Sequence, residues 1–565
     1  MTTTAWTVAL LLCGAGAPAA ASGAAPGGAG PGAEASARAA GVIGAPALGA
    51  HVRLLASDLL EGRLPGSRGD RLAQAYLVAQ LEALGLQPGA PGGGWLQEVP
   101  LVGISSQVKG PMRFTAGERS LSLAFGEEMM AAAGVQRDRA AWEDAEVVFV
   151  GYGITAPEFG WDDFKGVDVR GKVLLVMNND PEADPALFAG KTRLYYGRWT
   201  YKYEEAARRG AAGAIVIHTT PSAAYPWQVV RTSWAGQKFE LPDEGGPSIE
   251  VQGWATEAGS RAVAALGGHD LDALRAAAER RDFRPVPLGV RVSVTLENAI
   301  TRTASANVVG RLPGRDPRRA GEAVLYTAHH DHLGTIPGAV PGGDAIYNGA
   351  VDNATGVAAL LEIARAFTAL TARPARSILF AAVAAEEQGT LGSDFLARHP
   401  PVPAGRIAAV VNMDAMNVFG RTRDVTVVGF GKSTLDADVA AVAASQGRVV
   451  KPETHPDRGA YYRSDHFPFA KVGVPGAYVG GGDDFLGRPG GWGEAQREAW
   501  GRAHYHQPSD EWRDEYDLSG MVEDARLLFL LGLRVAEASG LPAWRPGDEF
   551  AAARREAVRA AAGMP

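Results

Sequence analysis

The sequence has a single cysteine, Cys13, among 565 residues, and it lies in an apolar N-terminal segment. Internal disulfides are therefore excluded, and removal of that segment would also exclude thiolate metal sites and a cysteine nucleophile. The sequence also has no excess of positive charge. The formal net charge is -8, which argues against a nucleic-acid-binding face. Beyond the N-terminus no apolar run approaches the length of a bilayer, so no stable membrane span is predicted.

The first 22 residues are typical of a secretory signal peptide. An apolar core over residues 5–13 is followed by small residues as far as Ala21, and a core of about ten residues is too short for a stable span. No Lys or Arg precedes this core, which a misplaced start codon would explain. We therefore expect export to the periplasm or the extracellular space. A lipoprotein anchored at Cys13 is the alternative, although Leu12 is bulkier than such sites normally accept.

The length of the chain predicts two domains with tails, because one hydrophobic core rarely serves so many residues. Residues 23–47 are mostly Ala, Gly, Pro and Ser, a composition typical of an unfolded linker. Helical patterns after residue 48 and an α/β pattern after residue 290 indicate one discontinuous main domain. The predicted boundaries are a signal peptide at 1–22, a linker at 23–47, the first part of the main domain at 48–130, an insert at 131–290, the rest of the main domain at 291–545 and a tail helix at 546–565.

The insert is rich in predicted strands, at residues 146–150, 173–177 and 214–217. The phrases Phe149-Val150-Gly151-Tyr152-Gly153-Ile154 and Gly210-Ala211-Ala212-Gly213-Ala214 resemble the protease-associated domain that is often inserted into exopeptidases. A generic β-rich insert is the alternative. We see no catalytic set within it, and its polar residues are expected to be structural or exposed, among them Asp162, Asp163 and His218.

The part after residue 291 alternates strands and helices, which indicates a layered α/β domain with a mainly parallel sheet. Short apolar runs suited to buried strands lie at 324–328, 378–384, 407–413 and 425–428. Residues 354–367 form an amphipathic pattern at helical spacing. Polar residues that follow such strands gather at the carboxyl edge of the sheet.

His329 is the first of several candidate metal ligands and directly follows a predicted strand. Neutral imidazole suits zinc, and Asp331 could hold its ring in one tautomer. Strand alternation places His329 and Asp331 on one face and His330 on the other. A lone His-x-Asp pattern would more simply be structural, so the prediction depends on the residues that follow.

Acidic residues continue the series. Asp352 precedes the amphipathic helix, where it would serve either as a helix cap or as a carboxylate bridging two ions. Glu386 and Glu387 are adjacent, so on an extended segment one could bind metal while the other faces an open position. Two buried like charges would be costly without a cation, and an exposed acidic turn is the alternative. Asp414 ends a strand, and a capping role is its alternative. His506 completes the set. His466 and His504 are expected to be structural or to support the ligands and not to bind metal themselves.

In this order, the residues resemble those of the M28 family of zinc exopeptidases, in the branch that carries a protease-associated insert. The resemblance implies a three-layer α/β zinc-exopeptidase fold with a mainly parallel mixed sheet. It also implies two zinc ions, for which Co²⁺ or Mn²⁺ could substitute. His330 departs from the Tyr or Leu usual in the family, and residues 335–344 lengthen the gap between the first two ligands and could line an entrance. The implied ligands are His329 and Asp414 on one zinc, Glu387 and His506 on the other, and Asp352 between them.

The resemblance also implies two catalytic residues. Glu386 would be the general base, and Tyr505 resembles the family tyrosine that donates a hydrogen bond to the developing oxyanion. Tyr461 and Tyr462 are alternatives for that role.

The implied activity is removal of N-terminal residues from peptides by a zinc-activated water. Three alternatives remain. A carboxypeptidase or dipeptidase would use the same site, but it would need an arginine for the substrate carboxylate, which the sequence does not locate. A glutaminyl cyclase would use one zinc, and the intact ligand set disfavours it. A receptor-like binding protein would have no need of a complete set of ligands.

Overall fold

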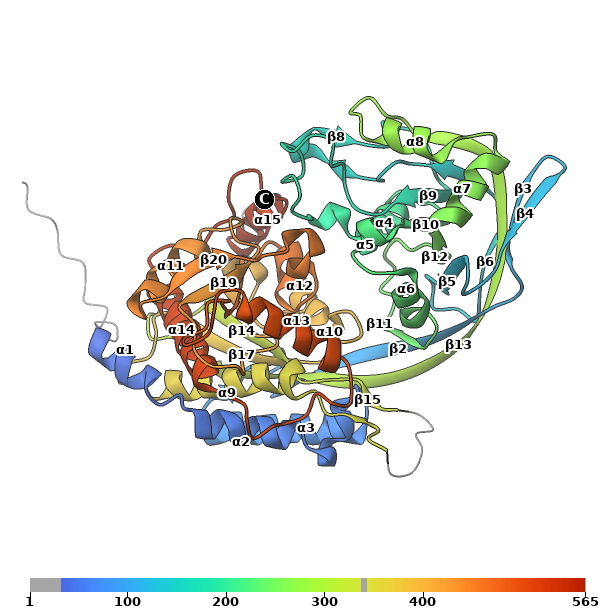
Figure 1. Ribbon diagram of the computed structural model, residues 1–565. Coiled ribbons are helices and arrows are strands. Elements are labelled where there is room, and N and C mark those ends of the chain that lie inside the picture. The colour runs from blue at the N-terminus through green and yellow to red at the C-terminus, as the bar shows by residue number, and fades with distance from the viewer. Residues whose placement is uncertain (1–31, 337–342, 564–565) are drawn as a thin grey trace, which may run out of the picture.

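The computed structural model describes residues 32–336 and 343–563 and shows two domains joined by two long strands (Figure 1). These strands are β2 (Leu96–Val108) and β13 (Val286–Leu312), which pair antiparallel from Val308↔Leu96 to Leu296↔Val108. The C-terminal end of β13 enters the sheet of the main domain, and its N-terminal half enters the sheet of the insert. The insert is therefore fixed to the main domain by a continuous β ribbon.

The sheet of the main domain has four central parallel strands. In spatial order it contains β13, β17 (Ser377–Val383), β14 (Ala323–His329), β18 (Ile407–Asn412), β21 (Gly476–Gly481), β19 (Asp424–Val428) and β20 (Val449–Pro452). The strands β13 and β19 run antiparallel to their central neighbours. Every residue of β14, β17 and β18 is buried, as expected for parallel strands covered on both faces. The predicted α/β class with a mainly parallel sheet is confirmed.

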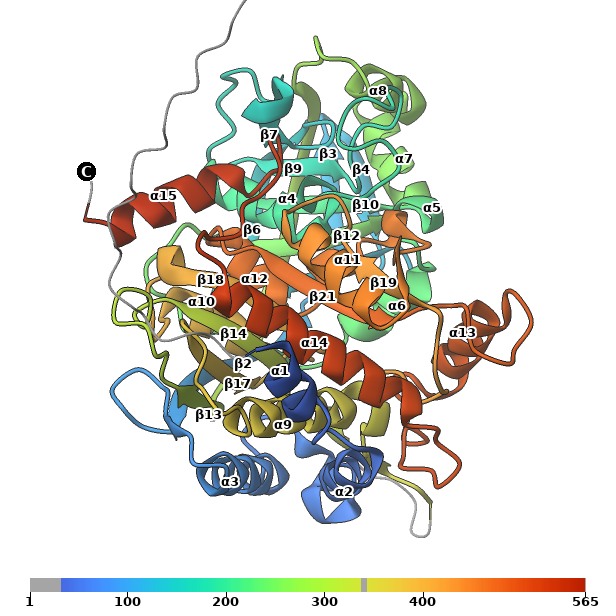
Figure 2. The same ribbon diagram turned by 90° about the vertical axis from the view of Figure 1, so that its left-hand side faces the viewer.

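Helices cover both faces of this sheet (Figures 1 and 2). The strand β14 lies between two apolar cores. Its Val324 and Tyr326 side chains belong to one core, and its Leu325 side chain belongs to the other. The first face carries α1 (Ala33–Ala40), α2 (Ala45–Leu55), α3 (Arg68–Ala83), α9 (Thr355–Thr368), α11 (Leu435–Ser445) and α14 (Ser519–Glu537), and the second carries α10 (Leu391–Arg398) and α12 (His466–Lys471). Within the described residues, no helix combines the length and apolar character that crossing a membrane requires.

The segment predicted as a linker is folded where the structure describes it. Residues 33–40 form α1, and Ala39, Ala40 and Ile43 are buried in the core that also contains α9 and α14. The linker prediction is therefore wrong for residues 32–47. Alanine is the best helix former, and here a short alanine-rich helix buries one side against a larger core. Residues 1–31, which include the predicted signal peptide, lie outside the described part.

The insert has its own sheet, in the order β13, β6, β9, β10, β12 and β5. The hairpin of β3 and β4 also pairs with β13, so the predicted boundary at residue 131 is wrong and the insert begins between β2 and β3. Its elements include β3 (Met112–Ala116), β4 (Arg119–Leu123), β5 (Met129–Ala133), β6 (Arg139–Phe149), β7 (Thr155–Ala156), β8 (Trp161–Asp162), β9 (Val173–Met177), α4 (Trp199–Arg208), β10 (Gly213–His218), α5 (Thr220–Ala223), α6 (Trp227–Ser233), β11 (Lys238–Glu240), β12 (Val251–Thr256), α7 (Glu257–Leu266) and α8 (Leu271–Ala278).

The two domains also meet through aromatic contacts. The ring of Tyr195, in the insert, lies 5.1 Å from Phe467 and 6.3 Å from Tyr462 between ring centroids. The backbone N–H of Tyr195 donates to Glu549 at 2.9 Å, and Lys471 pairs with Glu204 at 2.9 Å. The turn Tyr195–Gly197 is thereby held against the main-domain segment that contains Tyr462 and α12.

Candidate metal centre

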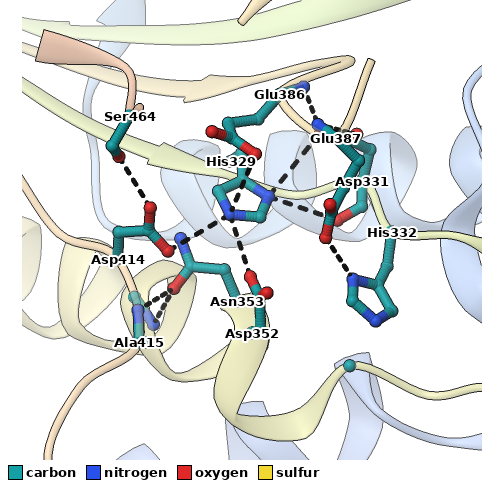
Figure 3. A network of polar contacts seen from close by, with 12 residues as sticks. His329, Asp331, His332, Asp352, Asn353, Glu386, Glu387, Asp414, Ala415 and Ser464 are labelled. Atoms are coloured by element: carbon teal, nitrogen blue, oxygen red, sulfur yellow. Dashed lines mark hydrogen bonds and ion pairs between the residues drawn. The ribbon is translucent and has the colours of Figure 1, made fainter. Parts of the chain in front are cut away.

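The five predicted ligands converge at the carboxyl edge of the parallel strands. Figure 3 shows four of them, His329, Asp352, Glu387 and Asp414. His329 is the last residue of β14, and Asp414 follows β18 closely. Glu387 lies in the turn after β17, and Asp352 precedes α9. His506 comes from the loop that follows α13 (Trp492–His504). The edge of a parallel sheet collects these residues because each strand ends there before its crossover begins.

The side chains form two pairs on either side of Asp352. His329 Nε2 lies 3.4 Å from Asp414 Oδ1 and 3.2 Å from Asp352 Oδ1. His506 Nε2 lies 3.0 Å from Glu387 Oε2 and 3.3 Å from Asp352 Oδ2. Each oxygen of Asp352 therefore faces a different pair, which is the placement that a carboxylate bridging two cations requires.

The charge of the cluster also fits bound cations. Carboxylates outnumber imidazoles among the residues gathered here: Asp331, Asp352, Glu386, Glu387, Asp414 and Asp465 surround His329, His332 and His506. Buried carboxylates without compensation are costly, and divalent cations would neutralise them. Imidazole nitrogen with carboxylate oxygen is a donor set that suits zinc and also accepts cobalt or manganese.

The adjacent glutamates have different surroundings. Burial, followed by the charge of Asp352, acts to raise the pKa of Glu387, but hydrogen bonds from His332 and His506 hold it at about 2. Burial raises the pKa of Glu386 well above its usual range, with His329 opposing the rise. The nearest imidazole nitrogen to Glu386 is His329 Nε2, 4.0 Å from its Oε2. Glu387 is thus engaged by imidazoles, whereas the carboxyl of Glu386 accepts no hydrogen bond from a histidine in the described part of the chain.

Asp331 was expected to hold the ring of His329 through its carboxylate, but that carboxylate makes other contacts. Its carboxylate accepts the backbone N–H of Glu386 at 3.0 Å and of Glu387 at 3.3 Å. The ring Nδ1 of His329 lies 3.8 Å from Asp331 Oδ1, beyond hydrogen-bond distance, and 3.3 Å from the Asp331 carbonyl oxygen. The ring contact therefore involves the backbone, and the carboxylate fixes the turn that carries both glutamates.

Sequence reasoning did not single out His332. Its Nδ1 lies 2.6 Å from Glu387 Oε1, and its ring centroid lies 5.8 Å from that of His506. Strand alternation would place His332 on the same side as His330, away from the site. The strand ends at His329, so alternation no longer holds two residues further on. His330 instead pairs with Asp70 at 3.0 Å, behind the centre.

Buried Arg63 joins the two loops that carry His329 and Asp352. Its Nε donates to the carbonyl of His330 at 2.7 Å, and its terminal nitrogens donate to the carbonyls of Asn348 and Gly349 at 2.6 and 3.0 Å. No sequence pattern marks Arg63, because these three partners lie more than 260 positions away. It makes the N-terminal helical segment part of the support of the site.

Tyr505 is the predicted tyrosine that lies at the centre. Its ring stacks on His506 at 3.9 Å, and 44% of the residue is exposed. Tyr462 instead donates to Glu549 at 2.6 Å, and Tyr461 packs against His466, so both alternatives point elsewhere.

Two further hydroxyl groups hold Asp414. The hydroxyl of Ser464 donates to its carboxylate at 2.6 Å, and Tyr478 donates to its carbonyl at 3.3 Å.

A cavity of about 780 Å³ opens beside the centre. Asp414 and Tyr505 form its edge, and its walls include Met416, Phe419, Val428, Phe485 and Trp500. An apolar cavity next to a polar centre is typical of a site that binds a side chain while chemistry occurs at its edge.

Two His–carboxylate pairs around a shared carboxylate form an arrangement that could hold two metal ions. Residues 307–529 match the model of peptidase family M28. The predicted resemblance to this family is therefore confirmed over these residues.

Curated relatives match shorter segments. A probable zinc metalloprotease of Pyricularia oryzae is 37% identical over 135 residues, which cover 22% of this chain and 25% of that protein. Aminopeptidase NAALADL1 of Mus musculus is 35% identical over 133 residues, which cover 23% of this chain and 16% of that protein. The chain thus spans a quarter or less of the length of these relatives. Among solved structures, an aminopeptidase from Aneurinibacillus sp. strain AM-1 aligns with 90% of this chain and 97% of its own, at 19% identity and a TM-score of 0.47.

Proposed function

We propose that this chain is an exported two-zinc aminopeptidase that removes N-terminal residues from peptides. The proposal rests mainly on the position of Asp352. Its two carboxylate oxygens face two separate His–carboxylate pairs. The M28 match over 307–529 and a relative named as an aminopeptidase support the same activity. Export rests on the signal-like residues 1–22, and the protease-associated character of the insert rests on its sequence resemblance.

His329 and Asp414 would hold one zinc ion, Glu387 and His506 the other, and Asp352 both. When bound, the ions supply an activated water and polarise the scissile carbonyl. Glu386 lies beside both pairs, where it can take a proton from water and return it to the leaving amine. Tyr505 stacks on His506 and can donate a hydrogen bond to the oxygen on which charge develops.

The substrate's first side chain would enter the apolar cavity beside Asp414 and Tyr505. The expected binding partners are therefore peptide substrates. The side chains of the cavity walls would determine which N-terminal residue is preferred.

The test is mass spectrometry of peptides with free, N-blocked and C-blocked ends, incubated with zinc-loaded protein and with a chelated control. We expect chelator-sensitive shortening of every peptide with a free N-terminus and none of the N-blocked peptides. Shortening from the C-terminus would replace the proposal with a carboxypeptidase. No cleavage by zinc-loaded protein would favour a binding protein that has kept its ligands.

A further inference from the structure

The insert contains a cavity of its own, of about 570 Å³, which shares no lining residue with the cavity beside the metal centre. It lies at the carboxyl ends of three strands: Met177 ends β9, Thr219 directly follows β10, and Glu257 directly follows β12. These strands are parallel neighbours in the sheet of the insert (Figure 1). The carboxyl ends of parallel strands are where open α/β sheets bind ligands, and the volume is in the range of small-molecule sites.

The wall of this cavity contains a buried oxygen without a partner. Asn178, the first residue after β9, lines the cavity and is only 4% exposed. Its Nδ2 donates to the carbonyl of Ser222 at 3.1 Å. Its Oδ1 is buried and accepts no hydrogen bond from residues 32–336 or 343–563. Because nearly all buried polar atoms in folded proteins have partners, this oxygen is an acceptor that a ligand in the cavity can use.

The side-chain hydroxyl groups of the wall already donate within the protein. Tyr152 donates to the carboxylate of Glu279. Thr219 donates to the hydroxyl of Ser222 at 2.8 Å, and Ser222 donates to the carbonyl of Thr219 at 3.2 Å. A bound molecule would therefore have to supply the donors for the free acceptor.

Acidic groups also outnumber basic groups in the wall. Three carboxylates line the cavity, those of Glu182, Glu257 and Glu279, and Arg275 is the one basic residue among the described lining residues, so two negative charges remain in excess. Arg275 pairs with Glu257 at 2.6 Å. Within the described part of the chain Glu182 and Glu279 form no ion pair. Glu182 accepts the side-chain amide of Asn179 at 2.6 Å, and Glu279 accepts two backbone N–H groups at 3.1 and 3.0 Å. The cavity therefore favours a ligand with a positive charge.

The apolar part of the wall suits the stem of a long side chain. Met177 and Ile217 line the cavity from β9 and β10, and Ala276 lines it from α8. Lysine and arginine pack their methylene stems along apolar surface while their charged ends reach polar groups. Apolar walls, a free acceptor and excess negative charge are together the features that such a side chain requires.

We propose that this cavity binds a basic side chain, lysine or arginine, of a peptide. The ammonium or guanidinium group would donate to the free oxygen of Asn178, in the same cavity as the carboxylates of Glu182 and Glu279. Hydrogen bonds from a charged donor are roughly twice as strong as those between neutral groups. The insert then binds peptides at a place separate from the metal centre. This activity goes beyond the proposed hydrolysis and does not depend on it.

The experiment measures binding to zinc-loaded protein by calorimetry. The probes are the Nα-acetyl amides of arginine, of lysine and of citrulline, which has nearly the shape of arginine but no charge. None of them has a free amino group, so the proposed aminopeptidase activity cannot consume them. We expect the arginine and lysine probes to bind at least tenfold more tightly than the citrulline probe, on the order expected for hydrogen bonds to a charged group. Equal affinity for the three probes, or no binding of the arginine and lysine probes, would overturn the inference.

A variant that fills the cavity locates the bound probe. Ala276 is exposed on α8 and lines the cavity, so Ala276→Trp should occupy the space and weaken binding of the arginine probe at least tenfold. Ala265→Trp, at an exposed position of α7 outside the lining residues, is the matched control and should bind as wild type does. Unchanged affinity in Ala276→Trp would place the probe elsewhere and overturn the inference.

A second variant tests the charge. Glu182→Gln keeps the shape of an exposed side chain and removes one negative charge, so it should weaken binding of the arginine probe by about threefold, as expected for a partly screened charge. Its effect on the citrulline probe should be smaller. Glu118→Gln, in the exposed turn before β4, is the matched control. An equal effect of Glu182→Gln on both probes would contradict recognition by charge.

The binding test and the test of the proposed function fail separately. Protein that binds the arginine probe but shortens no peptide would overturn the proposed aminopeptidase alone. Protein that shortens peptides but binds the arginine and citrulline probes equally would overturn the cavity in the insert alone.

Discussion

The insert and the main domain each bury a cluster of charged groups, and the clusters differ in how they are satisfied. In the insert, Lys202 donates to the carbonyl oxygens of Tyr152, Asn179 and Tyr196 at 2.7, 2.8 and 2.6 Å. Nearby Asp163 accepts hydrogen bonds from the Ile154 N–H and the Trp161 indole N–H, both at 2.9 Å. The protein itself supplies the partners of both groups.

The cluster of the main domain has the opposite character. Its carboxylates gather around two imidazoles, those of His329 and His506, and the protein provides too few positive groups to balance them. Buried charge alone therefore does not mark a functional site. What distinguishes the metal centre is an excess of one sign, which a bound ion can correct.

If the main-domain cluster performs the chemistry, Glu386→Gln will have the largest effect on activity. The variant keeps the shape of the side chain but cannot accept a proton, so turnover should fall by roughly 10²–10⁴-fold. Zinc content, measured by elemental analysis, should stay at the wild-type value because the ligands are untouched. Full activity in this variant would overturn the assignment of the base.

If the insert cluster is purely structural, Lys202→Met will reduce stability. It leaves three carbonyls without their donor and removes the positive charge that acts on Asp180 and Asp163. The change should cost about 3–5 kcal/mol in the free energy of unfolding. Denaturant unfolding measures the loss. Lys191→Met, at an exposed position of the insert, is the control, and equal stability of the two variants would contradict this account of the cluster.

The contrast becomes sharper at His332, which contacts Glu387 without belonging to either predicted pair. Removing a hydrogen bond to a ligand typically costs about 10–100-fold in metal affinity, so His332→Leu should release zinc more readily to a competing chelator. His332→Asn should recover part of the affinity, because its amide N–H can donate from a similar position. His399→Leu, at an exposed position, is the control. Unchanged zinc retention in His332→Leu would show that the contact has no role.

The smallest predicted effect concerns acid stability at His466, a buried ring beside the site. Burial lowers its pKa to about 3, against the opposing effect of the Tyr461 backbone. The folded state thus favours the neutral ring, so the stability it contributes is complete above about pH 6.5 and is lost as the pH falls toward 3. At pH 5 the loss should be about 2 kcal/mol.

Unfolding free energies at pH 7 and pH 5 test this effect. His466→Leu should show a smaller loss between these two values than wild type does. The same loss in both proteins would assign the acid sensitivity to other groups.

Much of the main domain could be predicted from sequence because its signals are local. The apolar runs at 324–328, 378–384 and 407–413 correspond to β14, β17 and β18. The amphipathic pattern at 354–367 corresponds to α9. The candidate ligands could be selected because each follows such an element, and the rule that strand ends share one edge then brings them together.

Features that depend on distant contacts could not be predicted. His332 approaches Glu387 only because the chain leaves strand geometry after His329. Arg63 donates to carbonyls of His330, Asn348 and Gly349, which lie more than 260 residues away, and no local pattern marks it. The helix α1 was missed because composition alone does not show that an alanine-rich segment has a core to pack against.

The central claim is that Asp352 joins two metal sites, and diffraction from zinc-loaded crystals at the zinc absorption edge tests it most directly. We expect two anomalous peaks, one beside His329 and Asp414 and one beside Glu387 and His506, with Asp352 contacting both. A single peak, or zinc bound only at a group such as His455, Glu494 and Glu498, would contradict the two-metal account.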